Sequence, residues 1–291
     1  MICTFSGSHR KASTASQNDR RAVLGRPGCP AGSLDLVSDL VLWCGPVVLT
    51  KEFRQIDWYG RDVRIVTIAG AGSSYFSTMG DALRDSNGRI LPTLLRRHTP
   101  RDVQRLDKVV LGSYSAGWGL LDKVARVDED RKRISAFMLS DSCFGGGKRG
   151  YEKAAVDAVH GKLLMVATTA HTTPGGYPTG RDSWKMVWDY AADQTGKSDR
   201  IVTPREPVPA ASGGWHRMGS ALYWGSYTVP GSPENQGNDL THEEHHYLAP
   251  EVWQAYLAPW LAGRLSFPWM PMLAGALVGA ASGYAAHELR R

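Results

Sequence analysis

A serine between small residues is the first feature of this sequence that could do covalent chemistry. Ser115 lies in the segment SYSAG, residues 113–117, after the apolar residues 109–111 and before Leu120-Leu121. A serine hydroxyl becomes a nucleophile only when a base removes its proton, a third group orients that base, and donors stabilise the oxyanion. A sharp turn from strand to helix, flanked by small residues, presents such a serine. The pattern predicts Ser115 as a nucleophile, and an ordinary Gly/Ser turn is the alternative.

The acid of such a site is expected after the serine and before the histidine in chain order. Asp141 follows the next apolar run, residues 134–139, where a short turn would direct its carboxylate at the site. Asp141 is therefore the predicted acid. Asp182 is the alternative, although it also suits the N-terminus of a helix starting near Ser183, and Asp239 comes third.

The base is expected in the segment THEEHH, residues 241–246, after the last predicted strand. His242 holds the loop position and is the predicted base, with His245 and His246 as alternatives. The string also fits H-E-x-x-H, so a zinc-dependent hydrolase is a further hypothesis. A zinc site needs that string on a firm helix with a third ligand, and Pro250 beyond it indicates a loop and a helix start instead. No metal is predicted, and plain surface histidines remain another interpretation.

The oxyanion needs two backbone donors, and the amide of Ala116, next to the nucleophile, is expected to be one. The second is expected from Gly70, Ala71 and Gly72, which follow the predicted strand 64–69, because glycine allows the backbone to approach a substrate closely. A dinucleotide loop is a weak alternative, since the third glycine of G-x-G-x-x-G is missing. No cofactor is predicted. Two residues are expected to line a substrate pocket, Tyr114 and His171, although His171 also suits a plain rim position.

Short apolar runs alternate with helix-like stretches from residue 36 onward. This order predicts an α/β fold, a mostly parallel sheet with helices on both faces, in which functional groups gather at the carboxyl ends of the strands. A helix is expected over 249–261, and the stretch 196–219, rich in Pro and Gly, is expected to be loop. The strands expected to carry the site lie at 64–69, 108–111, 134–139 and 163–168.

The segment SYSAG, the loop at Gly70–Gly72, Asp141 and the histidine cluster together resemble the α/β-hydrolase fold superfamily, over residues 36–262. The resemblance implies a three-layer sandwich and a serine esterase or lipase-like enzyme. Such an enzyme cleaves a carboxylic ester or amide through an acyl-enzyme intermediate, here with Ser115, His242 and Asp141. The superfamily pattern has glycine where this chain has Ser113. A non-catalytic assembly protein on the same fold is therefore the alternative, since fold does not fix function.

Composition divides the chain into a polar segment 1–35, expected to be disordered, a domain over 36–264 and a Gly/Ala-rich tail over 265–291. The net charge of +6 is spread along the sequence, so no nucleic-acid partner is expected. Residues 1–35 lack the apolar stretch of a signal peptide, which predicts a cytoplasmic location. Gly275, Gly279 and Gly283 share one face of a helix, which suggests membrane association or self-association through 267–286, or packing on the domain.

Overall fold

A single sheet organises the molecule. The computed structural model describes residues 2–7, 37–70, 72–144, 149–170, 180–227 and 245–265. Within these residues nine strands form one sheet in the order β1-β3-β2-β4-β5-β6-β9-β8-β7. Their bounds are β1 (Ile2–Gly7), β2 (Val37–Cys44), β3 (Val63–Ile68), β4 (Arg105–Tyr114), β5 (Ala136–Ser140), β6 (Leu164–Thr169), β7 (Asp199–Val202), β8 (Trp215–Met218) and β9 (Leu222–Ser226).

The middle of the sheet is parallel and its two margins are antiparallel. Strands β3, β2, β4, β5, β6 and β9 run in the same direction. Strand β1 pairs antiparallel with β3 at one edge, and β8 and β7 continue antiparallel from β9 at the other. Every residue of β5 and β6 is buried, as expected for parallel strands covered on both faces.

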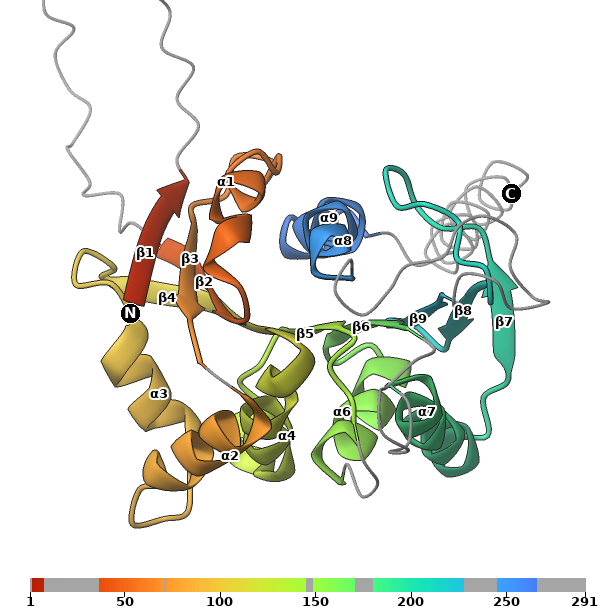
Figure 1. Ribbon diagram of the computed structural model, residues 1–291, viewed down its shortest axis with the longest axis horizontal. Coiled ribbons are helices and arrows are strands. Elements are labelled where there is room, and N and C mark those ends of the chain that lie inside the picture. Colours follow the sequence, from red (N-terminus) through yellow and green to blue (C-terminus); the bar gives the residue numbers. More distant parts are fainter. Residues whose placement is uncertain are drawn as a thin grey trace, which may run out of the picture.

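Helices cover both faces of this sheet, which makes a three-layer sandwich (Figure 1). Helices α2, α3, α4, α6 and α7 lie on one face, and α1, α8 and α9 lie on the other. The helical segments are α1 (Thr50–Phe53), α2 (Gly72–Ala82), α3 (Leu91–His98), α4 (Trp118–Arg126), α5 (Asp128–Arg131), α6 (Arg149–Val159), α7 (Gly180–Thr195), α8 (His245–Val252) and α9 (Ala258–Leu261), with short turns η1 (Val47–Leu49), η2 (Ser115–Gly117) and η3 (Trp253–Leu257).

Each face of the sheet has its own hydrophobic core. On the face of α8, the ring of Trp253 stacks on Phe53 with centroids 3.9 Å apart and meets Trp43 edge-on at 5.4 Å. A side chain at Gly112 of β4 would lie 2.9 Å from both tryptophans. The absence of a side chain at Gly112 therefore lets α8 and η3 pack closely over β4, the strand that leads to Ser115.

The predicted fold class is confirmed, and three local expectations differ from the structure. The stretch 196–219 contains β7 and β8, because pairing of β8 with β9 and of β7 with β8 supplies hydrogen bonds that its Pro and Gly content did not predict. Residues 2–7 form β1 on the edge of β3, within a segment expected to be disordered throughout. The helix expected over 249–261 starts earlier, at His245, and continues as a π-helical turn over Trp253–Leu257.

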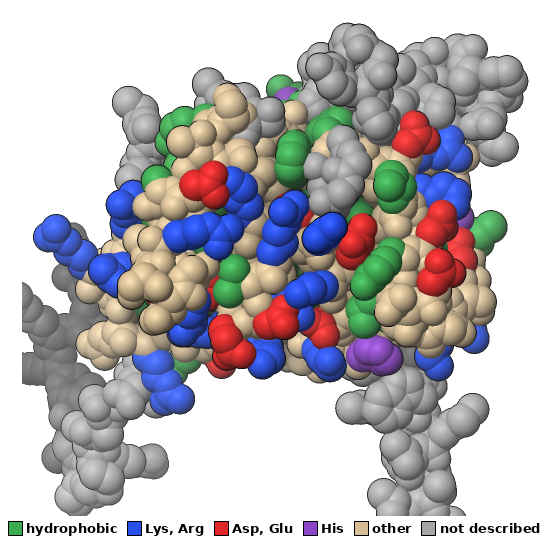
Figure 2. All heavy atoms as spheres, turned by 90° about the horizontal axis from the view of Figure 1, so that it is seen from below, with side chains coloured by type: hydrophobic (Ala, Val, Ile, Leu, Met, Phe, Trp, Pro, Cys, Tyr) green, Lys and Arg blue, Asp and Glu red, His purple; other side chains and the backbone are tan. Residues whose placement is uncertain are grey.

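The outer surface of the larger helical layer carries charges of both signs. Figure 2 shows Lys and Arg side chains spread over this face with Asp and Glu side chains among them. In the described part of the chain, no helix has the length and apolar character needed to cross a membrane. The tail from residue 266 lies outside the described residues, so its predicted association stays a prediction.

Candidate functional site

Ser115 occupies a strained turn between β4 and α4. Its backbone φ is +48°, a left-handed conformation that costs a non-glycine residue about 1–3 kcal/mol. Tyr114 before it is still extended, and Trp118 begins the helix two residues after Ala116. A Cβ on Gly117 would lie 2.5 Å from the carbonyl oxygen of Cys44 at the end of β2, so this position has room only for glycine. The turn is therefore narrow and holds the half-buried Ser115 at the carboxyl edge of the sheet.

Ser113, which departs from the superfamily pattern, takes part in a buried chain of hydroxyl groups under this turn. The Oγ atoms of Ser113 and Ser142 are 2.6 Å apart, and Ser142 Oγ donates to the carbonyl oxygen of Ser115 at 3.0 Å. Because Ser142 has one hydroxyl proton, Ser113 must be the donor to Ser142. Burial raises the pKa of Tyr151, whose hydroxyl also hydrogen-bonds with Ser113, so this phenol stays protonated.

The contact of Ser142 with the serine turn was not predicted from the sequence, although Ser142 directly follows Asp141. One sequence feature could have indicated this contact, because Ser142 comes just after the end of the strand beside β4. A hydroxyl at that point can reach the turn after β4. Ser113 is therefore the residue that orients this clamp, in the place where the superfamily has glycine.

Asp141 follows β5 directly and stands beside Ser115 across the sheet. Tyr114 pairs with Ser140, so each of the two residues is the first after its strand. Asp141 is also left-handed, with φ +39°, and Tyr59 is the other non-glycine residue with positive φ among those described. Two of these three strained positions thus share one edge of the sheet, where strain marks a candidate functional site.

The carboxylate of Asp141 is buried and held toward β6 and α7. Its Oδ1 accepts a hydrogen bond from the amide of Ala170 at 3.1 Å. A side chain on Gly180, the first residue of α7, would lie 2.2 Å from the same oxygen. The positive end of α7 faces this negative charge and stabilises it. Asp182, the alternative acid, is exposed in the first turn of α7.

Two of the predicted histidines open α8, which packs against β5. His245 is fully buried with its ring 5.3 Å from that of Tyr227. The ring of His246 meets Tyr114 edge-on at 5.2 Å. Since Tyr114 directly precedes Ser115, the THEEHH segment ends next to the serine turn. His242, the predicted base, lies outside the described residues, as do Glu243 and the predicted pocket residue His171.

His216, the remaining late histidine of the described chain, has both ring nitrogens engaged away from this edge. Its Nδ1 lies 2.7 Å from Asp199 Oδ2 and its Nε2 lies 3.1 Å from the carbonyl oxygen of Gly213. Among the described residues, no group of three or more His, Cys, Asp or Glu side chains is arranged to hold a metal ion. Residues 241–244, which include the first histidine of the H-E-x-x-H string, lie outside the described residues.

The strand order changes which loop is nearest to the predicted oxyanion site. Strand β2, and not β3, is the direct neighbour of β4, with Cys44 paired to Ser113. The loop that starts at Gly45 therefore begins beside the serine turn, whereas Gly70 is one strand further away. A side chain on Gly70 would lie 2.3 Å from the ring of Tyr75, so glycine at this position leaves room for that ring.

Helix α2, which follows the Gly70–Gly72 segment, nevertheless lies next to the serine turn. It begins at Gly72 and packs against the turn Ser115–Gly117. Ala71 lies outside the described residues. The Gly70–Gly72 segment thus stays a prediction for the oxyanion site, and the end of β2 is a second place for a donor that the chain order did not indicate.

The strand order, with one antiparallel strand at the β3 edge and a serine turn after a central parallel strand, is of the α/β-hydrolase type. No protein-family model matches the sequence, and no curated protein matches it. Among solved structures, the chain is similar to a thermostable esterase, with 12% identity and a TM-score of 0.41. The match covers 78% of this chain and 52% of the esterase, so the chain spans about half of that protein's length.

Two further solved structures are similar at the same low level. A poly(3-hydroxybutyrate) depolymerase from Bordetella parapertussis has 12% identity and a TM-score of 0.40, with 80% of this chain and 82% of that one covered. An acetyl xylan esterase from Aspergillus awamori has 11% identity and a TM-score of 0.35, with 69% and 86% covered.

Proposed function

We propose that the protein is a serine hydrolase that cleaves a carboxylic ester, or an amide, through an acyl-enzyme intermediate. The observation that carries the proposal is the left-handed Ser115 on a turn from a central parallel strand to a helix, closed by Gly117 against Cys44. Backbone strain of this kind is retained where the surrounding structure enforces it, as the Ser113–Ser142 clamp does here.

In the first half-reaction, Ser115 Oγ attacks the acyl carbon while His242 takes the hydroxyl proton. The carbonyl oxygen becomes an oxyanion, which the amide of Ala116 and a second backbone amide stabilise. The second amide comes from the loop after β2 or from Gly70–Gly72. When the intermediate collapses, the carbon–oxygen bond to the alcohol breaks, and His242 returns the proton to that alcohol.

In the second half-reaction, water attacks the acyl-enzyme. His242 takes a proton from the water, the ester bond to Ser115 breaks, and the serine regains its proton as the acid product leaves. Asp141 orients the imidazole and stabilises its charged form. His245 and His246 are the alternative bases and Asp182 the alternative acid. Tyr114 and His171 are proposed to line the substrate pocket.

A fluorophosphonate probe tests the nucleophile, because it phosphonylates only an activated serine. We expect the full chain to be labelled at Ser115, as located by mass spectrometry of the labelled peptide. Ser115→Ala should abolish the labelling, and Ser220→Ala, in the turn between β8 and β9, should leave it unchanged. Failure of the folded wild-type chain to react would overturn the proposal and favour a non-catalytic protein.

The base is then identified by comparing three single substitutions. His242→Ala is expected to lower the labelling rate at least about a hundredfold, the effect typical of losing a general base. His245→Ala and His246→Ala should each have smaller effects. A larger loss in either of them would move the assignment to that residue, and loss of activity with a chelator in the absence of serine labelling would support the zinc hypothesis.

A further inference from the structure

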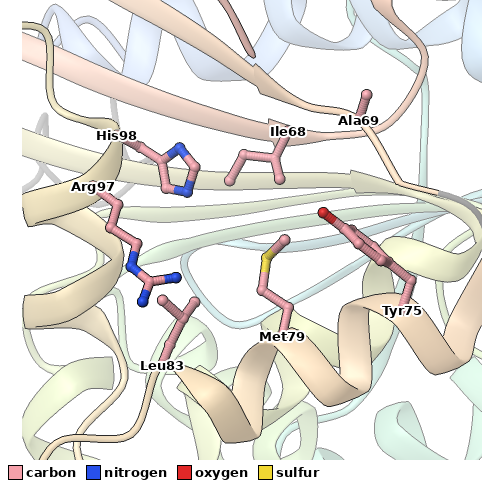
Figure 3. Close-up of a pocket in the computed structure, with 7 residues that line it drawn as sticks. All are labelled: Ile68, Ala69, Tyr75, Met79, Leu83, Arg97 and His98. Atoms are coloured by element: carbon pink, nitrogen blue, oxygen red, sulfur yellow. The ribbon is translucent and has the colours of Figure 1, made fainter. Parts of the chain in front are cut away.

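A cavity whose lining contains no residue of the serine turn lies between the sheet and two helices. It has a volume of about 370 Å³ and lies among the end of β3, helix α2 and the end of α3 (Figure 3). Ile68, Met79 and Leu83 form an apolar wall along it. Its volume falls within the range of small-molecule binding sites, which combine apolar walls with a few placed polar groups.

Two nitrogen-bearing side chains lie together at one end of this cavity and come from the last turn of α3. Figure 3 shows the side chains of Arg97 and His98 entering from that helix, on the side opposite to Tyr75. In the described part of the chain Arg97 has no ion pair, whereas Arg84 pairs with Asp81 and Arg89 pairs with Asp130. Among the described residues, no carboxylate therefore neutralises the Arg97 guanidinium of this cavity.

His98 is a second group available to a ligand. Its Nδ1 is buried and has no hydrogen-bond partner among the described residues. A buried polar atom left without a partner is unfavourable, so a ligand that satisfies it binds more tightly. Burial, and secondarily the charge of Arg97, lowers the pKa of His98, which keeps the ring neutral at pH 7 and able both to donate and to accept.

The opposite end of the cavity is open beside an aromatic ring. Tyr75 is 44% exposed, and it also lines an adjoining hollow of about 550 Å³ together with Met79 and Arg97. A bound molecule could thus extend from the guanidinium along Met79 and over the phenol ring. The chemistry changes along this path from a cationic end to an apolar wall.

We propose that this cavity binds a monocarboxylate with a hydrocarbon chain. The carboxylate pairs with the Arg97 guanidinium, whose planar fork matches two carboxylate oxygens, and hydrogen-bonds with His98. The chain lies along Ile68 and Met79 toward Tyr75. The site is independent of the proposed hydrolase activity, and Ser115→Ala is expected to bind the same ligand equally well.

Titration calorimetry of the full chain with octanoate tests the site at low ionic strength. Octanol, which has the same chain without the charge, and acetate, which has the charge without the chain, serve as comparison probes. We expect octanoate to bind with a dissociation constant below about 1 mM and each comparison probe to bind at least about tenfold more weakly.

Two neighbouring arginines give a matched pair of variants. Arg97→Gln should weaken octanoate binding at least about tenfold, since it removes a charge-assisted contact. Arg96→Gln removes the same charge one residue away, outside the cavity lining, and should change binding less than about twofold. Met79→Trp should block the apolar wall, with circular dichroism confirming that the variant folds.

The proposal is overturned by any of three results. The first is that octanoate fails to bind to the wild-type chain. The second is that octanol binds as well as octanoate, and the third is that the two arginine substitutions weaken octanoate binding equally. Equal weakening would show that net charge alone attracts the anion. Because Ser115→Ala is tested in parallel, a failure of the hydrolase proposal is distinguished from a failure of this one.

Discussion

At the scale of single residues, the serine turn depends on atoms that do not react. Ser142 Oγ donates to the carbonyl oxygen of Ser115, and Ser113 donates to Ser142. Both serines are buried, at 1% and 0% exposure, so water cannot replace either bond easily. The carbonyl of Ser115 and the amide of Ala116 belong to the same planar peptide group, so a hydrogen bond to this carbonyl also fixes the direction of the amide. The clamp therefore positions both the proposed nucleophile and one proposed oxyanion donor.

Removing the clamp hydroxyl with Ser142→Ala should lower the rate of fluorophosphonate labelling about tenfold. The physical reason is that one hydrogen bond to the strained turn is lost, which costs about 1–2 kcal/mol of positioning energy. The labelling rate and the thermal unfolding midpoint of the same sample are the measurements. Ser113→Ala should have a smaller effect, because Ser142 can still donate to Ser115. An unchanged labelling rate in folded Ser142→Ala would contradict this positioning function.

The acid assignment is also a question at the residue scale. Asp141→Asn should lower the labelling rate more than about a hundredfold, because an amide cannot stabilise the charged imidazole. Asp182→Asn, at an exposed position of α7, should stay within about threefold of wild type. The two rates measured side by side decide the acid. The reverse order of effects would transfer the assignment to Asp182.

At the scale of elements, α3 is held at its start by a carboxylate from another helix. Ile90 at the N-cap of α3 has no side-chain cap of its own. Asp130 of α5 is fully buried, and its Oδ2 accepts the amides of Ile90 at 2.7 Å and Leu91 at 2.9 Å. The negative charge also meets the positive end of α3. This contact sets where α3, and with it Arg97 and His98, lies relative to α2.

Asp130→Ala should therefore destabilise the protein by about 2–3 kcal/mol, since two buried amides lose their acceptor and Arg89 loses its ion partner. Chemical denaturation gives the free energy of unfolding. Asp128→Ala is the control on the same short helix. Its carboxylate pairs on the surface with Arg131 and Lys153, which lower its pKa to about 2. A loss for Asp130→Ala no larger than for Asp128→Ala would contradict the capping function.

At the scale of the whole molecule, the sheet carries a buried charge at the start of β2. The Asp39 carboxylate is inaccessible to solvent, and its Oδ1 accepts Arg61 Nη2 at 2.8 Å. Burial raises the pKa of Asp39, and the Arg61 guanidinium opposes that rise. The pair lies at the end of the central strands opposite to Ser115, so it contributes to stability and not to chemistry.

Arg61→Ala should cost about 1–3 kcal/mol of stability near neutral pH, because it leaves a buried carboxylate unpaired. Without Arg61, the folded-state pKa of Asp39 rises further above its unfolded value. The stability deficit should therefore shrink as the pH falls from about 7 to about 4.5, because protonation removes the carboxylate charge that Arg61 no longer pairs. Urea unfolding at both pH values measures the change.

Arg84→Ala is the control for this pH dependence, because Arg84 pairs with the exposed Asp81. Its effect should be below about 0.5 kcal/mol at both pH values. If the Arg61→Ala deficit is constant between the two pH values, the unpaired Asp39 is not its cause.

The sequence by itself determined the fold class and the serine turn. Both follow from local order: apolar runs that alternate with helical patterns, and small residues on either side of Ser115 where a strand must give way to a helix. Asp141 was also placed correctly at the end of its strand, although its function as an acid stays a prediction.

Only the tertiary structure decided which segments lie beside that turn. The chain order put Gly70 after the preceding predicted strand, but the sheet places β2 next to β4 and moves Cys44 and Gly45 to the serine. The tertiary structure also places Ser142 in contact with Ser115, and it places Arg97 in the same cavity as Met79. These contacts depend on strand order and helix packing, which join residues far apart in the chain and leave no periodic pattern in the sequence.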